Sequence, residues 1–149
     1  MAVDKKATLT YVQLMKEDLA VFRLVPEDGI IPDYDAGQFI TVGMPIPSEA
    51  NKIVRRAYSM ASHPENKKFI ELVIRWVRRP LPGRVTTALF NAGEGDEVSW
   101  IPPTGVALKI NEKLGDGTKD TRRICCVSGG TGIAPFMSFA RHLRAIGDK

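Results

Sequence analysis

The sequence has few of the features that mark membrane, secreted or nucleic-acid-binding proteins. No apolar run in its 149 residues approaches the roughly 18 residues of a transmembrane helix. The N-terminus, MAVDKKATLT, carries no apolar segment of the kind found in secretory signals. The formal net charge is only +4, and no basic stripe is interleaved with aromatic residues. These absences predict a cytoplasmic protein that binds neither a membrane nor a nucleic acid.

Cysteine is scarce, and its placement excludes two common uses. The two cysteines, Cys125 and Cys126, are adjacent. Neighbours on a strand point to opposite faces, so they are poor disulfide partners. Without a second cluster of ligands they are also poor metal ligands. We therefore expect two buried thiols and no metal site.

The first part of the chain has the patterns of β-structure. Six short segments are rich in alternating or β-branched residues, and they begin near Thr8, Leu19, Gly37, Arg55, Lys67 and Asp96. The sixth is expected to break at Pro102 and Pro103. Between the last two, residues 85–93 have a helical pattern that Gly93 ends. The spacing predicts a mainly β protein with a six-stranded antiparallel barrel in residues 1–110.

After residue 110 the pattern changes. Residues 111–123 are polar and predict a linker or an exposed hairpin. Residues 124–128, ICCVS, resemble a strand that is buried on both faces of a parallel sheet. Residues 134–147 predict an amphipathic helix, with Phe136, Phe139, Ala140 and Leu143 on its apolar face and Arg141 and Arg144 off it. Residues 111–149 therefore predict a linker and the first strand, turn and helix of a Rossmann-like α/β domain.

Two turns are candidate anion sites. In SGGTG, Gly130, Thr131 and Gly132 lie between the expected strand and helix, where backbone N–H groups can approach a phosphate. Gly83 comes just before the first helix, and Thr86 lies in the first turn of that helix. A tight turn without a ligand and ordinary threonine capping are the alternatives.

The segment RRAYSMAS places a cation, a flat ring and a hydroxyl within four positions. On a strand, Arg56 and Tyr58 project to one face, and Ala57 and Ser59 to the other. Arg56 is suited to neutralise a diphosphate, Tyr58 to lie against an aromatic ring, and Ser59 to bond the edge of that ring. An edge strand with a surface arginine and a half-buried tyrosine is the alternative.

In this order and spacing, RAYS, GRVTTAL and GGTGIAPF resemble the bacterial branch of the ferredoxin–NADP reductase family. The resemblance covers nearly the whole chain. It implies an FAD-binding barrel followed by an NAD(P)H-binding domain, with electrons passing from NAD(P)H to a one-electron carrier of the ferredoxin or flavodoxin type.

The resemblance also implies roles for individual residues. Arg56 would contact the FAD diphosphate, Tyr58 would stack on the isoalloxazine beside Ala57, and Ser59 would lie near flavin N5. The backbone of VIRWV, with Val73, Arg75 and Val77, would cradle the ribityl and diphosphate. The glycine-to-threonine motif would bind the diphosphate, and it comprises Gly83, Arg84, Val85 and Thr86. Gly130, Thr131 and Gly132 would face the nicotinamide nucleotide, and Pro102 to Gly105 would lie near its nicotinamide end.

The chain also departs from the family. A complete member would continue for roughly another 100 residues, so the resemblance implies a fragment or a degenerate form. An unpaired 124–128 strand would pair with the barrel or with a second copy of the chain, making a homodimer possible, or it would be part of a disordered tail.

The basic residues Lys67, Lys68, Arg75, Arg78 and Arg79 suggest a docking face for an acidic carrier, or only a solvated surface. A non-catalytic flavin-binding electron-transfer module and a cofactor-free interaction barrel remain the alternative functions. The residues do not decide between FAD and FMN, or between NADH and NADPH.

Overall fold

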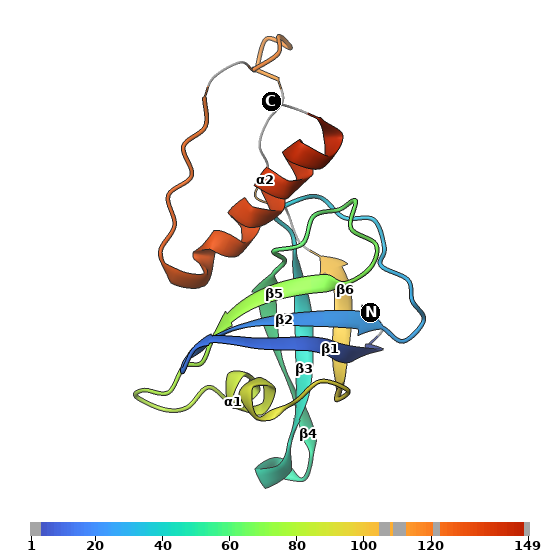
Figure 1. Cartoon of the computed structure of the whole chain (residues 1–149), viewed down its shortest axis with the longest axis vertical. Helices are drawn as coiled ribbons and strands as arrows, with labels where there is room; N and C mark the ends of the chain where they lie inside the picture. Colours follow the sequence, from blue (N-terminus) through green and yellow to red (C-terminus); the bar gives the residue numbers. More distant parts are fainter. Residues whose placement is uncertain (1–3, 105–107, 109–112, 121–122, 148–149) are drawn as a thin grey trace.

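Six antiparallel strands form one curled sheet. The computed structural model describes residues 4–104, 108, 113–120 and 123–147. The strands are β1 (Lys5–Lys16), β2 (Leu19–Pro26), β3 (Phe39–Ile46), β4 (Lys52–Ser59), β5 (Ile70–Arg75) and β6 (Glu97–Thr104). Their order in the sheet is β4-β3-β6-β1-β2-β5. Figure 1 shows β1, β2 and β5 crossing β3, β4 and β6, so that the two halves enclose the core. The predicted mainly β, six-stranded antiparallel barrel is confirmed.

The barrel is closed only loosely between β4 and β5, the two edge strands of the sheet. In the described part of the chain, β4 and β5 are joined by a single bridge, between Met60 and Leu72. The amide of Ala61 adds a hydrogen bond of 2.8 Å to the Glu71 carbonyl. Beyond this closure point β4 and β5 pair only with β3 and β2, so the hydrogen-bonded wall is interrupted between β4 and β5, and this unpaired stretch is called the β4–β5 gap below.

Two helices cover opposite ends of the barrel (Figure 1). Helix α1 (Arg84–Asn91) turns Val85 and Leu89 into the core, and its Phe90 packs edge-on against Phe22 of β2 with a centroid distance of 5.6 Å. Helix α2 (Ala134–Ile146) follows the 3₁₀ turn η2 (Gly130–Ile133). A second 3₁₀ turn, η1 (Pro47–Glu49), links β3 to β4. Both predicted helices are therefore present.

Alternation along the strands builds the core. In β2, Ala20, Phe22 and Leu24 are fully buried and the residues between them are partly exposed. Period-2 alternation of this kind places one face of a strand on a core. Trp100 of β6 is the largest fully buried side chain, and its Nε1 donates to the Lys6 carbonyl at 3.3 Å.

The prediction that the sixth strand breaks at Pro102 and Pro103 is wrong, because β6 continues to Thr104. The ladder between β3 and β6 has an irregular register between Phe39 and Thr41, opposite these prolines. A bulge tolerates residues that cannot donate to the ladder. Gly105 and the predicted boundary at residues 110–111 lie outside the described residues.

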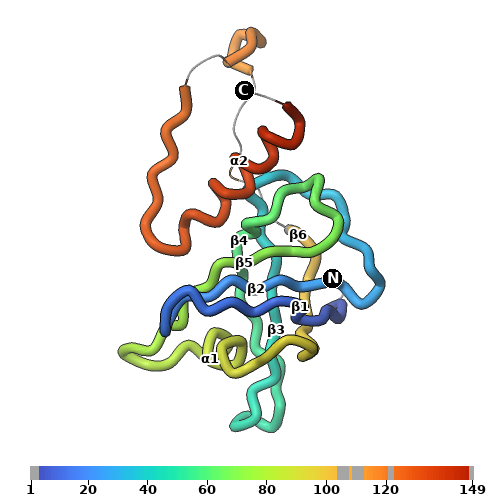
Figure 2. The backbone as a smooth tube through the Cα atoms, in the orientation of Figure 1, coloured from blue at the N-terminus to red at the C-terminus, as the bar shows by residue number. Residues whose placement is uncertain are grey.

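The predicted strand at residues 124–128 does not form. Residues 123–129 are extended chain without ladder pairing to any described strand, and Figure 2 shows this segment running apart from the barrel. Ile124 and Val127 are exposed, and so are both cysteines, so the prediction of buried thiols is also wrong. An apolar strand needs neighbours in its own sheet, and the described part of the chain offers it none. Pairing with the barrel is thereby excluded for these residues, whereas exchange with a second copy stays a prediction.

Residues 113–120 form the expected exposed hairpin. Lys113 bridges Lys119, and the Leu114 amide donates to the Thr118 carbonyl at 2.8 Å. Among the described residues, neither helix combines the length and the apolar character that crossing a membrane requires.

Candidate functional site

The candidate site is the gap between β4 and β5. Arg56 lies opposite Val42, and Tyr58 lies opposite Ile40, on neighbouring β3. Directly opposed residues share a face of the sheet, and both partners are fully buried, so Arg56 and Tyr58 are on the core-bearing face. Tyr58 packs against the core, whereas Arg56 is exposed and makes no ion pair within the described part of the chain.

The Tyr58 hydroxyl is the most informative atom of this gap. It is buried and has no hydrogen-bond partner among the described residues. Burial raises the pKa of Tyr58 to about 12, although the nearby charge of Arg56 opposes the rise. A buried hydroxyl without a partner is costly, so such an atom is usually satisfied by water or a ligand. The hydroxyl therefore suits a group that brings polar atoms into the gap.

Ala57 and Ser59 lie on the other face of β4, as predicted from alternation. They are opposite Thr41 and Phe39. Ala57 is exposed and Ser59 is half-buried. Ser59 is the last residue of β4, next to the closure point at Met60.

The predicted residues of β5 and of the segment that follows it lie on the opposite side of the gap. Val73 is half-buried, and Arg75 and Val77 are exposed. Arg75 forms an ion pair of 3.4 Å with Asp18. The Val77 carbonyl accepts a 2.8 Å hydrogen bond from the Gly83 amide, which closes the 77–83 loop at the start of α1.

The turn at the N-terminus of α1 lies at one end of the gap, because α1 contacts both β3 and β4. Gly83 has no room for a side chain, since an added Cβ would lie 2.6 Å from Thr86 Oγ1. That hydroxyl donates to the Gly83 carbonyl at 3.0 Å, and no side chain caps the helix. The alternative of ordinary threonine capping is therefore wrong here, and first-turn amides remain available.

Two residues of this turn differ in what they can offer a ligand. Arg84 donates from Nη1 to both carboxylate oxygens of Glu49, at 2.8 and 2.9 Å. Its charge is thus largely matched within the chain, whereas the exposed Arg56 makes no ion pair with a described residue. The Val85 side chain is buried in the core, so only its backbone can face the gap.

The η2 turn lies beside β5 at the opposite end from α1. Gly130 has φ of +57°, a conformation that favours glycine, and Gly132 N donates to the Gly129 carbonyl at 3.2 Å. Thr131 is half-buried. The structure thus arranges all the predicted site residues along β4, along β5 and at the two turns that adjoin these strands.

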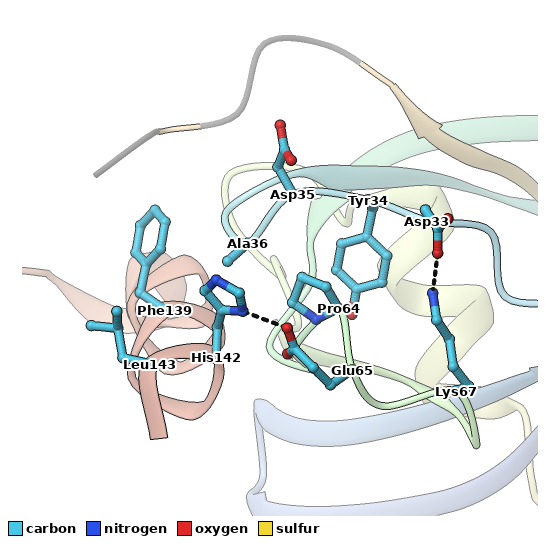
Figure 3. A pocket seen from close by; sticks show the side chains of 10 residues that line it. All are labelled: Asp33, Tyr34, Asp35, Ala36, Pro64, Glu65, Lys67, Phe139, His142 and Leu143. Atoms are coloured by element: carbon cyan, nitrogen blue, oxygen red, sulfur yellow. Dashed lines mark hydrogen bonds and ion pairs between the residues drawn. The ribbon is translucent and has the colours of Figure 1, made fainter. Parts of the chain in front are cut away.

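A hollow lies under α2 (Figure 3). Its volume is about 550 Å³, and none of the predicted site residues lines it. Asp33, Asp35 and Glu65 contribute carboxylates to it, against the cation of Lys67. Like charges repel, so this hollow is a poor site for a diphosphate. The gap between β4 and β5 remains the candidate.

The predicted basic cluster is divided. Lys67 and Lys68 precede β5, whereas Arg75, Arg78 and Arg79 lie at its end and in the loop that follows. Lys67 pairs with Asp33 at 2.9 Å, and Arg78 Nη2 donates to the Glu17 carbonyl at 2.7 Å. The cluster is not one continuous docking face.

Comparison with known proteins decides the family. Residues 6–108 match the family model described as the oxidoreductase FAD-binding domain. The chain belongs to this family. The resemblance to ferredoxin–NADP reductases is confirmed, since such reductases and flavohaemoglobin reductase domains are among the structural neighbours of this FAD-binding domain.

Individual relatives show how much of a longer protein this chain matches. It is 30% identical over 133 residues to a flavohemoprotein of Bordetella pertussis, covering 88% of this chain and 31% of that protein. It is 27% identical over 148 residues to the reductase component of propane 2-monooxygenase of Mycolicibacterium goodii, covering 97% and 38%. The chain thus spans about a third of the length of these curated relatives.

A solved structure agrees in fold. The flavohem-like FAD/NAD binding domain of nitric oxide dioxygenase from Vibrio cholerae superposes with a TM-score of 0.81 at 22% identity. The match covers 97% of this chain and 59% of that one.

Sequence reasoning missed the contact that attaches α2 to the FAD-binding domain. Arg141, expected off the packing face of α2, donates from Nη1 to Glu71 Oε1 at 2.7 Å and to the Ala61 carbonyl at 2.8 Å. Ala140, expected on that face, is exposed. The expectation failed because an arginine counts as polar in a helical pattern, whereas here it meets a buried carboxylate. No local signal in the sequence pairs residues 70 positions apart.

Acid is expected to loosen this contact. Burial acts to raise the pKa of Glu71, but hydrogen bonds from Arg141 and Arg23 outweigh it and hold the pKa below the usual 4.5. A carboxyl group whose pKa is lowered by folding adds stability above its unfolded pKa, and this stability is lost as pH falls through the folded value. We expect the free energy of unfolding to fall less between about pH 7 and pH 3 in Glu71→Gln than in the wild type. Urea unfolding across this range tests it, and parallel pH profiles of the two proteins would contradict it.

Proposed function

We propose that the chain is the flavin-binding part of an oxidoreductase that passes electrons from NAD(P)H to a one-electron carrier of the ferredoxin or flavodoxin type. The observation that carries the proposal is the joint placement of exposed Arg56 and the unpartnered Tyr58 hydroxyl at the β4–β5 gap. The family supports the flavin. The names of two relatives, a monooxygenase reductase component and an FAD/NAD binding domain, support nicotinamide and an electron-accepting partner.

The residues present fit FAD. Arg56 would neutralise the diphosphate, and the first-turn amides of α1, from Arg84 to Thr86, would donate to it beside the close turn at Gly83. Tyr58 would offer its ring face to the isoalloxazine and its hydroxyl to a polar atom of the cofactor. Because its pKa is about 12, the phenol would stay protonated near neutral pH and act as a hydrogen-bond donor.

The remaining site residues would orient the partners of the reaction. Bound FAD would supply hydride acceptance from nicotinamide and one-electron release. Ser59 would hydrogen-bond the flavin edge and change the rate more than the affinity, and Ala57 would allow close approach. The backbone of Val73, Arg75 and Val77 would line the cofactor, and the turn Gly130, Thr131 and Gly132 would face the nicotinamide nucleotide. Arg75, Arg78 and Arg79 would steer an acidic carrier in the cytoplasm.

An anaerobic spectrum tests the function. The purified chain is mixed with FAD, freed of excess cofactor, and titrated with NADPH and then NADH while the flavin absorbance is followed. Bleaching by either nucleotide is the result expected. A bound flavin that neither nucleotide bleaches would favour a non-catalytic electron-transfer module. Absence of a bound flavin would favour a cofactor-free interaction barrel.

The Tyr58→Phe variant separates stability from cofactor binding. Since the hydroxyl is buried without a partner, its removal is expected to leave the apoprotein as stable or up to about 1 kcal/mol more stable. The same change is expected to weaken FAD binding by about 5-fold, because a hydrogen bond to the cofactor is lost. Urea unfolding of the apoprotein and a flavin titration measure the two effects. A clear loss of apoprotein stability would show that the hydroxyl is already satisfied within the chain.

A further inference from the structure

The outer face of β5 carries a buried carboxylate. Ile70, Leu72 and Ile74 point into the core, so Glu71 points outward, yet its side chain is only 4% exposed. Desolvating a carboxylate costs several kcal/mol unless it is paired and hydrogen-bonded. On a barrel that stood alone, an outward residue of this kind would be solvated. Helix α2 changes this, because it lays Arg141 against Glu71.

Each oxygen of this carboxylate is bound by a different arginine. Arg141 of α2 donates to Oε1 at 2.7 Å, and Arg23 of β2 donates to Oε2 at 2.9 Å. Arg23 is fixed within the barrel, since its guanidinium lies over the rings of Tyr11 and Phe69, at 4.6 and 4.3 Å. Glu71 thus links a cation of the barrel to a cation on α2.

Two more contacts place neighbouring turns of α2 on the same surface. Ser138 Oγ donates to the Ser62 carbonyl at 2.7 Å and is fully buried. His142 Nδ1 lies 2.7 Å from Glu65 Oε1, as Figure 3 shows. Positions 138, 141 and 142 lie on one side of a helix. Three independent polar contacts therefore fix both the rotation and the axial position of α2.

The position of α2 sets the position of η2. Helix α2 starts at Ala134, directly after η2, and Arg141 lies seven residues further on, about 10 Å along the axis. A short, rigid helix transmits its placement to the turn at its N-terminus. η2 also contacts β5, the strand that carries Glu71. We propose that Glu71 and Arg141 are positioning residues that hold the η2 turn against the β4–β5 gap at the distance needed for electron transfer from nicotinamide. This role rests on the proposed function.

The test compares three variants with one control, in the protein at the length its gene encodes. Arg141→Met and Glu71→Gln are the link-breaking variants, because each removes one charge of the Arg141–Glu71 ion pair. Arg141→Lys keeps a positive charge at this position but lacks the several N–H donors of the guanidinium. Arg144→Met is the control, because Arg144 is exposed on the same helix. Three quantities are measured: bound FAD per chain, amide hydrogen exchange in residues 134–146, and the anaerobic rate of flavin reduction at saturating NAD(P)H.

We expect Arg141→Met and Glu71→Gln to bind FAD as the wild type does, and their α2 amides to exchange about 10-fold faster. Their flavin reduction should slow by between about 10-fold and 100-fold, since displacement by an ångström costs this much in rate. Arg141→Lys should recover part of the rate, and Arg144→Met should match the wild type.

Three outcomes overturn the proposal. If α2 exchange in both link-breaking variants equals that in Arg144→Met, the link does not hold the helix. If α2 exchanges faster but the reduction rate is unchanged, the link holds the helix without positioning the turn. A wild-type flavin that no nicotinamide nucleotide bleaches overturns the proposed function and the positioning role with it, while the exchange measurement still decides whether Glu71 anchors α2.

Discussion

Replacing Arg56 with alanine is expected to weaken FAD binding by about 2 kcal/mol, or roughly 30-fold. Arg56 is exposed at the β4–β5 gap and has no acidic partner in the described part of the chain, so its charge is available to a diphosphate. Two other cations of the predicted site are already paired, Arg84 with Glu49 and Arg75 with Asp18. Removal of Arg56 therefore leaves the diphosphate with backbone donors alone.

Arg55→Ala is the matched control for this measurement. Arg55 is the next residue on β4, but it lies opposite Gly43 on the other face of the sheet and pairs with Asp4. Flavin titrations should give Arg55→Ala an affinity within about 2-fold of the wild type. Equal affinities for Arg56→Ala and Arg55→Ala would remove Arg56 from the cofactor site.

Trp100→Ala is expected to lower the free energy of unfolding by about 3–5 kcal/mol. Trp100 is fully buried on β6, the strand that pairs with both β1 and β3 and thereby joins the two halves of the barrel. Its loss leaves a cavity at this junction and removes the hydrogen bond to the Lys6 carbonyl. Urea unfolding of the apoprotein measures the effect.

Leu14→Ala provides the control for stability. Leu14 is 63% exposed near the end of the β1–β2 hairpin, and its loss should change the free energy of unfolding by less than about 0.5 kcal/mol. If Trp100→Ala cost no more than Leu14→Ala, the indole would not fill the core between the two halves of the barrel.

The strands of the barrel were predictable because one face of each meets a core. In β2 the sequence from Leu19 to Val25 is apolar except for Arg23, which indicates a strand, and the structure buries Ala20, Phe22 and Leu24 on one face of it. The helix at α1 was equally visible, from its turn at Gly83 to its apolar Val85 and Leu89. Patterns with a period of two or 3.6 residues report a buried face without knowledge of what buries it.

The predictions that the structure contradicts share a different cause: each concerns residues whose structure depends on a partner far away in the sequence. The apolar run at 124–128 indicates a strand, but whether it pairs depends on neighbours that the local pattern does not contain. The helical pattern places Arg141 off the apolar face, because its carboxylate partner, Glu71, lies on a different element. Pro102 and Pro103 were expected to end a strand, but the register irregularity opposite them accommodates both. Each outcome was fixed by tertiary contacts rather than by local propensity.

The candidate site was predictable as a set of residue types, but not as a geometry. RAYS and the two glycine turns indicated a nucleotide, and alternation gave the faces of Arg56 and Tyr58 correctly. The sequence did not show that Arg84 is matched by Glu49, or that the Tyr58 hydroxyl is buried without a partner. These two facts make Arg56 and Tyr58 the residues on which the proposal depends.

A crystal structure of the chain with FAD tests the central claim most directly. The account predicts the flavin ring against Tyr58 in the β4–β5 gap, with the diphosphate bonded to the Arg56 guanidinium and to amides of residues 84–86. FAD bound instead in the hollow under α2, with the gap filled by side chains and Arg56 directed into solvent, would contradict it.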